Sequence, residues 1–195
     1  MKKLKIIKST MLPLNMSNVD TDQIMPKQFL KRVERSGYGE YLFHDWKKDP
    51  DFPLNNGLYK GAKVLVAGDN FGTGSSREHA PWGLQDWGFE AIISTKFADI
   101  FRLNSINIGL VPIETNQENV EALFSKIDTD SETIIQISIE DKTVVCGDIS
   151  FSFSLDDFSQ KRIIEGLDKI DITLGYLDQI ENFSQSRKRW KPKLV

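Results

Sequence analysis

The chain has 195 residues, of which 39% are hydrophobic and 27% charged, a balance typical of a globular protein with a sizeable core. Its formal net charge of −3 argues against a protein that binds nucleic acid through a basic face. No apolar run approaches the roughly 20 residues that a membrane-spanning helix needs. We therefore expect neither a nucleic-acid partner nor a membrane. One domain is expected over residues 1–195, with about 156–195 as a C-terminal helical extension.

The N-terminus predicts a strand rather than a leader. Lys5–Ile7 is a candidate strand, and Met11–Leu14 is expected to continue it past the turn residues between them. Lys5 and Lys8 interrupt the apolar run here, whereas a secretory signal needs about 7–15 continuous apolar residues. We therefore expect a cytoplasmic protein.

A polar loop, a short helix and a long loop are predicted next. Asn18–Pro26 is polar and carries two carboxylates two residues apart, at Asp20 and Asp22. Because no third acid follows at the spacing of a calcium loop, their pattern is more typical of turn and capping residues. Gln28–Glu34 has helical character, and Tyr41–Gly57 is expected to be a long loop because prolines and an Asn-Asn-Gly sequence interrupt it.

A buried strand followed by glycines is the most informative stretch of the chain. Val64–Ala67 is an uninterrupted apolar run, which predicts a strand buried on both faces in a parallel sheet. Gly68, Gly72 and Gly74 follow it, so the backbone can turn tightly there and approach a ligand without a Cβ in the way. A glycine loop at the carboxyl end of such a strand lies where open α/β sheets bind ligands.

The residues after the glycines predict a helix start with the character of an anion site. Ser75 and Glu78 match a capping box, which predicts that a helix begins at this point. The free N–H groups of a helix start favour an anion, and the planar guanidinium of Arg77 suits a carboxylate or phosphate. Pro81 conflicts with a regular helix, so either the helix kinks there or a separate turn precedes it.

The glycine loop fits none of three familiar glycine motifs. It lacks the lysine of a phosphate-binding loop and the third glycine of a dinucleotide-binding loop. It also lacks the final glycine of a nucleophile elbow, because Glu78 stands at that position. From the spacing alone, two interpretations stay open: an anion-binding loop of another class, and an ordinary glycine turn with an N-cap.

The remainder of the chain predicts further alternation of strands and helices, and then an antiparallel unit. Two more buried strands, separated by a helix, complete a βαβαβ succession and predict a right-handed parallel sheet. An amphipathic helix, three antiparallel strands and two further helices follow. In chain order these elements are expected at 91–93, 97–104, 110–113, 120–127, 133–140, 143–146, 149–154, 158–167 and 170–180.

The few cysteines and histidines limit what metal chemistry the chain can support. Cys146 is the only cysteine, which excludes an internal disulfide and an iron–sulfur cluster ligated by this chain alone. It is expected to be a small core residue. His44 and His79 are too few for a histidine-rich metal site. The basic tail, Arg187–Lys193, is most simply a solvated terminus.

Four ordered segments resemble one known family. The sequence GDNFGTGSSREHAPWGL at 68–84 resembles the signature of the small subunits of 3-isopropylmalate dehydratase, which are similar to the swivelling domain of aconitase. Asn18–Pro26, Phe97–Phe101 and Leu167–Leu174 resemble further segments of that family in the same order. The resemblance covers most of the chain. It implies an α/β fold like the aconitase swivel domain (β/β/α), with a mostly parallel central sheet, a few antiparallel strands and C-terminal helices.

The resemblance also implies a function and a partner. The family is the small subunit of the hydro-lyase that interconverts 2-isopropylmalate and 3-isopropylmalate through 2-isopropylmaleate in leucine biosynthesis. Its large subunit carries a 4Fe-4S cluster, so the resemblance implies a heterodimer or heterotetramer in which this chain holds no cofactor. Methylmalate/citraconate, dimethylmalate and homoaconitate remain alternative substrates. An alternative from another class is a non-catalytic anion-binding domain.

By resemblance, the residues after the glycine loop carry the chemistry. Ser75 is implied to be the base that removes the substrate proton, acting as an alkoxide. Ser76 is implied to hydrogen-bond the substrate, and Arg77 to bind one of its carboxylates. Glu78 and His79 are interpreted as structural residues.

The polar loop and the short helix are implied to contribute the remaining contacts. The resemblance gives Asp22 a hydrogen-bonding or electrostatic role rather than metal ligation. The segment Phe29–Leu30–Lys31 stands where small subunits of this family read the variable side chain of the substrate. Phe29 and Leu30 would supply the apolar contact for an isopropyl group, and Lys31 a cationic contact.

Overall fold

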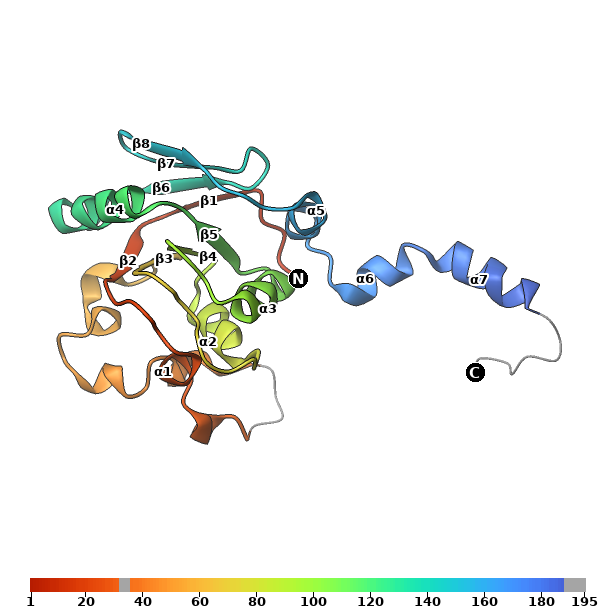
Figure 1. The fold of residues 1–195 in the computed structure, drawn as a ribbon, viewed down its shortest axis with the longest axis horizontal. Coiled ribbons are helices and arrows are strands. Elements are labelled where there is room, and N and C mark those ends of the chain that lie inside the picture. Colours follow the sequence, from red (N-terminus) through yellow and green to blue (C-terminus); the bar gives the residue numbers. More distant parts are fainter. Residues whose placement is uncertain (32–35, 188–195) are drawn as a thin grey trace.

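The computed structural model describes residues 1–31 and 36–187. Among them, two four-stranded sheets lie one above the other, and a layer of helices and turns covers the lower face of the second sheet (Figure 1). The strands are β1 (Ile6–Ser9), β2 (Met11–Leu14), β3 (Val64–Ala67), β4 (Ala91–Ser94), β5 (Val111–Glu114), β6 (Ile135–Ser138), β7 (Thr143–Cys146) and β8 (Ile149–Ser152). The α-helices are α1 (Thr21–Ile24), α2 (His79–Trp87), α3 (Asp99–Ile108), α4 (Gln117–Thr129), α5 (Asp157–Glu165), α6 (Lys169–Leu174) and α7 (Leu177–Ser186).

The parallel sheet confirms the predicted βαβαβ unit. Its strand order is β2-β3-β4-β5, and all three neighbouring pairs are parallel. Every residue of β3 is buried, as its apolar run predicts. Both edge strands contain a proline, Pro13 in β2 and Pro112 in β5. Proline is tolerated at these edges because it cannot donate the hydrogen bond that a central strand requires.

The antiparallel sheet corrects the prediction for the N-terminus. Met11–Leu14 does not continue the first strand, because the chain crosses from one sheet to the other at Thr10. β1 pairs antiparallel with β6, whereas β2 pairs in parallel with β3. The sheet order is β1-β6-β7-β8, and short turns join β6, β7 and β8, the three strands predicted to be antiparallel. The first two strands therefore tie the two sheets together.

Two hydrophobic clusters separate the three layers. Val64 and Val66 of β3 belong to the cluster between the sheets, which α4 and the completely buried Cys146 complete. Leu65 and Ala67 belong to the other cluster, which α2 and the loops before β3 cover. This alternation follows from the two-residue period of a strand. The three-layer β/β/α arrangement agrees with the predicted fold class.

The long loop predicted before β3 is built from single turns of 3-10 helix. These turns are η2 (Gly39–Tyr41), η3 (Trp46–Lys48), η4 (Pro53–Asn55) and η5 (Gly57–Tyr59), and η1 (Lys27–Phe29) precedes them. Phe43, Trp46 and Phe52 pack on one another, with ring centroids 5.4–5.7 Å apart, and belong to the cluster below the parallel sheet. Of the helix predicted over 28–34, only residues 28–31 are described. The single turn η1 ends among them, at Phe29.

The C-terminal helices divide into one that packs on the body and two that leave it. α5 contributes the completely buried Ile163 to the core between the sheets. α6 and α7 extend away from the body (Figure 1), and neither buries a residue. The single helix predicted over 170–180 is broken at Gly175 and Tyr176. The described residues contain no helix long and apolar enough to cross a membrane. Most of the basic tail lies outside the described residues.

Candidate active site

The site lies where three segments meet at the carboxyl edge of the parallel sheet. The glycine loop follows β3, α1 follows β2, and α3 follows β4. Bridges between Asp20 and Thr73 and between Phe71 and Phe97 join these segments beyond the strands themselves. The sequence Val64–Ala67 therefore positions the loop at the edge where open α/β sheets bind ligands.

Two glycines let the loop pass close to its neighbours. Gly72 and Gly74 have φ angles of +81° and +91°, which side-chain-bearing residues rarely adopt. A Cβ on Gly72 would lie 2.2 Å from the ring of Phe101, and one on Gly74 would lie 2.1 Å from a carboxylate oxygen of Asp20. Both positions therefore require glycine for two reasons: the φ angle is positive, and the neighbouring side chain leaves no room for a Cβ.

Replacing Gly74 by alanine is therefore expected to destabilise the protein. A side chain forced into this φ region costs about 1–3 kcal/mol, and the Asp20 carboxylate must also move. Thermal unfolding of the variant measures the loss. Gly57→Ala is the matched control, because nothing lies within 4 Å of a Cβ at that position and its φ is ordinary. Equal stability of the two variants would contradict the close approach seen here.

The turn that follows the glycines precedes α2 rather than beginning it. α2 starts at His79, and its N-cap residue, Glu78, makes no side-chain capping bond. The predicted capping box from Ser75 to Glu78 is therefore wrong. Pro81 falls in the first turn of the helix, where an amide hydrogen is not needed, and this resolves the predicted conflict in favour of a separate turn. Ser75 is left free for other contacts.

The capping box that does form lies across the site, on α1. Asp20 accepts a hydrogen bond from the backbone N–H of Asp22 at 2.6 Å, and the side chain of Gln23 accepts one from the backbone N–H of Asp20 at 2.8 Å. Asp20 thus has the capping role expected from its spacing. The box fixes α1 and directs Asp22, the next carboxylate, towards the glycine loop.

Ser75, Arg77 and Asp22 form a connected polar group. The Arg77 Nε–H donates to Ser75 Oγ at 2.6 Å, and the Arg77 backbone N–H donates to the same oxygen at 3.4 Å. Arg77 Nη2 lies 3.3 Å from Asp22 Oδ1, and Lys27 Nζ lies 2.9 Å from Asp22 Oδ2. Hydrogen bonds donated to a hydroxyl oxygen favour its ionised form. The group is therefore arranged to lower the proton affinity of the serine oxygen.

The polar group borders an open depression with two chemically different walls. Thr21, Asp22, Ser75 and Arg77 line its polar wall, and the apolar wall is formed by Met25, Leu30 and Ala80 beside His79. About 170 Å³ of empty space, part of it open to solvent, lies among these residues. The side chains of Arg77 and Asp22 are 39% and 36% exposed, so a ligand can reach them. A Ser75–Arg77 pair sealed in the interior would have contradicted a catalytic role.

Ser76 is exposed at the rim of the depression. Its backbone carbonyl accepts a hydrogen bond from Asn104 Nδ2 of α3 at 3.0 Å. The turn is held on its other side by Thr21, whose Oγ1 accepts from the Ser75 N–H at 2.9 Å. The loop is therefore clamped between α1 and α3, and the Ser76 hydroxyl points to no partner that the structure records.

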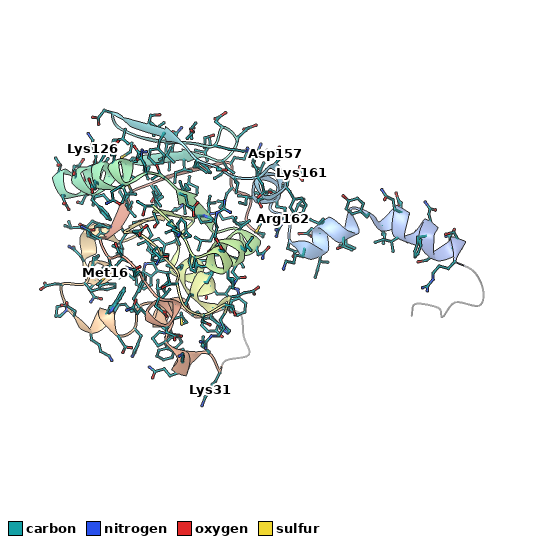
Figure 2. The ribbon with its side chains drawn as sticks, in the orientation of Figure 1. Met16, Lys31, Lys126, Asp157, Lys161 and Arg162 are labelled. Atoms are coloured by element: carbon teal, nitrogen blue, oxygen red, sulfur yellow. The ribbon has the colours of Figure 1, made fainter. Side chains whose placement is uncertain are left out.

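The segment 29–31 is only partly brought to the site. Leu30 lines the apolar wall of the depression. Phe29 stacks on Tyr41 with ring centroids 4.3 Å apart, and the ring of His44 lies 4.8 Å from it. It therefore supports the wall from behind. Lys31 is exposed at the outer edge of the body (Figure 2) and does not line the depression.

His79 packs at the base of the depression. Its ring lies 5.3 Å from that of Tyr38 and 4.7 Å from that of Trp82, and its Nδ1 is buried without a hydrogen-bond partner. Burial, and to a lesser degree the charge of Arg77, lower the pKa of His79 below its ordinary value of 6.5. The imidazole is therefore neutral at pH 7, in keeping with a structural role.

The lowered pKa of His79 predicts a pH-dependent stability. The His79 imidazole binds a proton more readily in the unfolded chain than in the folded one. The contribution of neutral His79 to the free energy of unfolding is therefore fully present above pH 6.5 and is lost as the pH falls through the lowered pKa. The free energy of unfolding of the wild-type chain is therefore expected to fall more between pH 7.5 and 5 than that of His79→Gln. Parallel pH profiles of the two proteins would contradict this.

The donor groups of this chain do not fit an iron–sulfur cluster. Its one cysteine, Cys146, is completely buried in β7 between the two sheets. Across residues 1–31 and 36–187, no group of three or more His, Cys, Asp or Glu residues is placed to hold a metal ion.

Three residues that sequence reasoning did not place in the site line it: Thr21, Met25 and Ala80. Thr21 is buried and fixes the turn that holds Ser75. Met25 and Ala80 are each 2% exposed and form part of the apolar wall. The Asp-x-x-Gln capping pattern at 20–23 was the available signal, because it turns α1 towards the glycine loop. Nothing local in the sequence brings Met25 beside Ala80.

This fold and this loop define the class of the protein. A β/β/α domain with a clamped serine–arginine turn at the carboxyl edge of its parallel sheet agrees with the aconitase C-terminal domain, whose family matches residues 1–118. The curated 3-isopropylmalate dehydratase small subunit of Micrococcus luteus is 48% identical over 93% of this chain and 90% of its own length. That of Rubrobacter xylanophilus is 43% identical over the full length of both chains.

A solved structure agrees with these relatives. The crystal structure of 3-isopropylmalate dehydratase from Methanocaldococcus jannaschii superimposes with a TM-score of 0.67 and 27% identity, covering 91% of this chain and 99% of that one. The chain belongs to the family of 3-isopropylmalate dehydratase small subunits.

Proposed function

We propose that this chain is the small subunit of a hydro-lyase that interconverts 2-isopropylmalate and 3-isopropylmalate through 2-isopropylmaleate in leucine biosynthesis. The names of the curated relatives support this reaction. The depression supports it as well, because its polar and apolar walls suit a dicarboxylate that bears a branched apolar group. A purely anion-binding domain would have no use for the apolar wall.

The observation that carries the proposal is the 2.6 Å hydrogen bond from Arg77 Nε to Ser75 Oγ. In the proposed step, the ionised Ser75 oxygen takes the proton on the carbon next to a carboxylate. The new O–H bond forms as the C–H bond breaks, and the released electron pair forms the carbon–carbon double bond as hydroxide leaves the adjacent carbon. Hydration of the alkene in the opposite sense gives the isomer: Ser75 returns the proton to the carbon that lost hydroxide, and hydroxide adds to the carbon that lost the proton.

Arg77 has two proposed roles in this step. Its Nε–H and backbone N–H stabilise negative charge on the serine oxygen. The outer edge of the guanidinium can bind a substrate carboxylate while charge builds on it, as a charge-assisted contact. Asp22 holds the guanidinium in place, and Lys27 balances the charge of that carboxylate. Ser76, at the rim, would hydrogen-bond the substrate.

The implied 4Fe-4S cluster is assigned to the larger partner subunit, because the donors of this chain do not fit it. Such a cluster supplies a Lewis acid for hydroxide departure. The proposed roles of Ser75 and Arg77 do not depend on how that group acts. We propose a heterodimer or heterotetramer in the cytoplasm, in which the partner closes the open side of the depression.

The apolar wall makes isopropylmalate the proposed substrate among related malates. Leu30 faces the depression directly, and Phe29 backs it through its stack on Tyr41. A second, cationic contact from Lys31 would need that side chain to turn inward when the partner binds.

A substrate comparison with the reconstituted pair tests the proposal. The chain is co-expressed with the large subunit from the same genome and assayed with 2-isopropylmalate and 2-methylmalate. We expect a kcat/KM for 2-isopropylmalate that is about tenfold higher or more, since each additional buried methylene contributes about 0.8 kcal/mol. Preference for 2-methylmalate would assign a related hydro-lyase. No turnover of either substrate by an assembled pair would favour the non-catalytic domain.

A further inference from the structure

The two last described helices form an arm with an uncovered apolar face. The arm, α6 and α7 (Lys169–Ser186), leaves the body beside α5 (Figure 1). Six of its large apolar side chains are between 42% and 69% exposed, although such side chains normally lie in a core. They are Ile170, Leu174, Tyr176, Leu177, Ile180 and Phe183.

The apolar side chains of α7 gather on one side of the helix. Ile180 and Phe183 follow the N-cap residue Tyr176 at i+4 and i+7, which places the three side chains on one face. Asn182 and Gln185 lie on the opposite face. Helices of six and ten residues are marginal in water on their own. The arm therefore has the sequence of helices that a second surface stabilises.

A line of contacts connects α5, the helix that precedes the arm, to the proposed active site. Asn104 of α3 donates to the carbonyl of Ser76, beside the proposed base. Asn107, three residues on, accepts a hydrogen bond through Oδ1 from Arg162 Nη1 of α5 at 3.2 Å. Arg162 lies at the root of the arm (Figure 2), and its guanidinium is 5.7 Å from the ring of Phe158.

Exposed apolar side chains follow the same line. Ile100 and Leu103 share a face of α3 with Asn104 and Asn107, at positions i, i+3, i+4 and i+7. Both are more than half exposed, and Phe158 on α5 is 60% exposed. Exposed apolar side chains therefore lie on α3, on α5 and on the arm that follows it. Exposed apolar side chains that gather in this way mark an interaction site.

We infer that the face of α3 and the arm form one docking surface for the cluster-bearing large subunit, an inference that rests on the proposed function. That subunit has to cover the open depression, and the surface begins at the rim of the depression. The arm carries three acidic residues, Asp171, Asp178 and Glu181, against one basic residue, Lys169, so the partner is expected to offer an apolar groove bordered by lysines or arginines. Helices that lie on membranes have a basic polar face instead.

Matched charge substitutions in the full-length chain test this surface. The double variant Ile180→Asp/Phe183→Asp places charges on the apolar face, and the control Asn182→Asp/Gln185→Asp places the same charges on the polar face. We expect the first to raise the Kd for the large subunit at least tenfold and the control to leave it within about twofold. Circular dichroism and thermal unfolding of the free chains confirm that all three are folded.

Two results would overturn the docking surface. One is an equal Kd for the wild-type chain and the apolar-face variant. The other is a wild-type dimer, seen by sedimentation of the chain alone, that this variant abolishes, because the face would then belong to a second copy. Turnover by the wild-type pair tests the proposed function separately. If the wild-type pair turns over substrate but the wild-type chain and the apolar-face variant have equal Kd values, the proposed function stands and the docking surface is rejected. If the apolar-face variant binds more weakly but the wild-type pair does not turn over substrate, the docking surface stands and the proposed function is rejected.

Discussion

Ser75→Ala is expected to lower the kcat of the reconstituted enzyme by about 10³-fold or more, the upper part of the range for a lost general base. The hydroxyl accepts one hydrogen bond from the Arg77 guanidinium and one from the Arg77 backbone N–H. The substitution removes one oxygen atom from a partly buried side chain outside the hydrophobic core, so the fold should be unaffected. The rate of alkene hydration, followed through the absorbance of the double bond, measures the loss.

The matched control for this substitution is Ser150→Ala. Ser150 is exposed on β8, in the sheet on the opposite side of the molecule from the depression. Its kcat and its melting temperature should equal those of the wild-type chain. A Ser75→Ala variant that retains near-normal kcat would reject the alkoxide, whatever its effect on KM.

Arg77→Lys is expected to lower kcat/KM by about 10²–10³-fold, the usual cost of losing one donor to developing negative charge. The guanidinium donates to Ser75 Oγ and contacts Asp22 Oδ1 at the same time, through two different nitrogens. A lysine ammonium is a point charge and cannot reproduce this fork, even though the net charge is unchanged. Steady-state kinetics on isopropylmalate measure the effect, with kcat lowered and KM raised.

Two further measurements separate a catalytic Arg77 from a structural one. The melting temperature of Arg77→Lys should stay close to that of the wild-type chain, because the side chain is 39% exposed and its ion pair with Asp22 contributes little to stability. Arg77→Ala should regain activity when guanidinium ion is added. A mild kinetic effect, or a loss of activity that follows a loss of stability, would contradict the proposed role of Arg77 in stabilising the Ser75 oxygen and binding a substrate carboxylate.

Most of the fold was predictable because its strands are encoded by uninterrupted apolar runs. Val64–Ala67 can only be satisfied by burial on both faces, and a glycine loop followed by a helix implies the parallel neighbours. The exchange of sheets at Thr10 was not predictable, since it depends on β6, more than 120 residues away in the sequence. Local patterns carry no information about a partner at that distance.

The two capping patterns show where local sequence rules fail. Ser75–Glu78 and Asp20–Gln23 both match the spacing of a capping box, yet only the second forms one. The Ser75 hydroxyl accepts a hydrogen bond from Arg77, and the Ser75 backbone N–H donates one to Thr21 of α1. Tertiary contacts outweigh a local cap worth about 1 kcal/mol. Such a departure from a local rule is expected at a functional loop, because its side chains are positioned to contact the ligand rather than to cap the helix.

Of the predicted site residues, the structure groups Ser75, Arg77, Asp22 and Leu30 around one depression, and the resemblance to a known family was what singled them out. Phe29 supports the depression from behind, and Lys31 lies away from it. The walls formed by Met25 and Ala80 could not be predicted, because they result from how α1 packs against α2.

A competition experiment tests most directly whether this chain supplies half of a shared catalytic site. The large subunit is held constant with a saturating amount of wild-type chain, and Ser75→Ala chain is added in increasing excess. We predict that the variant displaces the wild-type chain and that turnover falls in proportion to the wild-type fraction, since the variant still docks but carries no base. Turnover that stays constant while the variant demonstrably enters the complex would contradict the account.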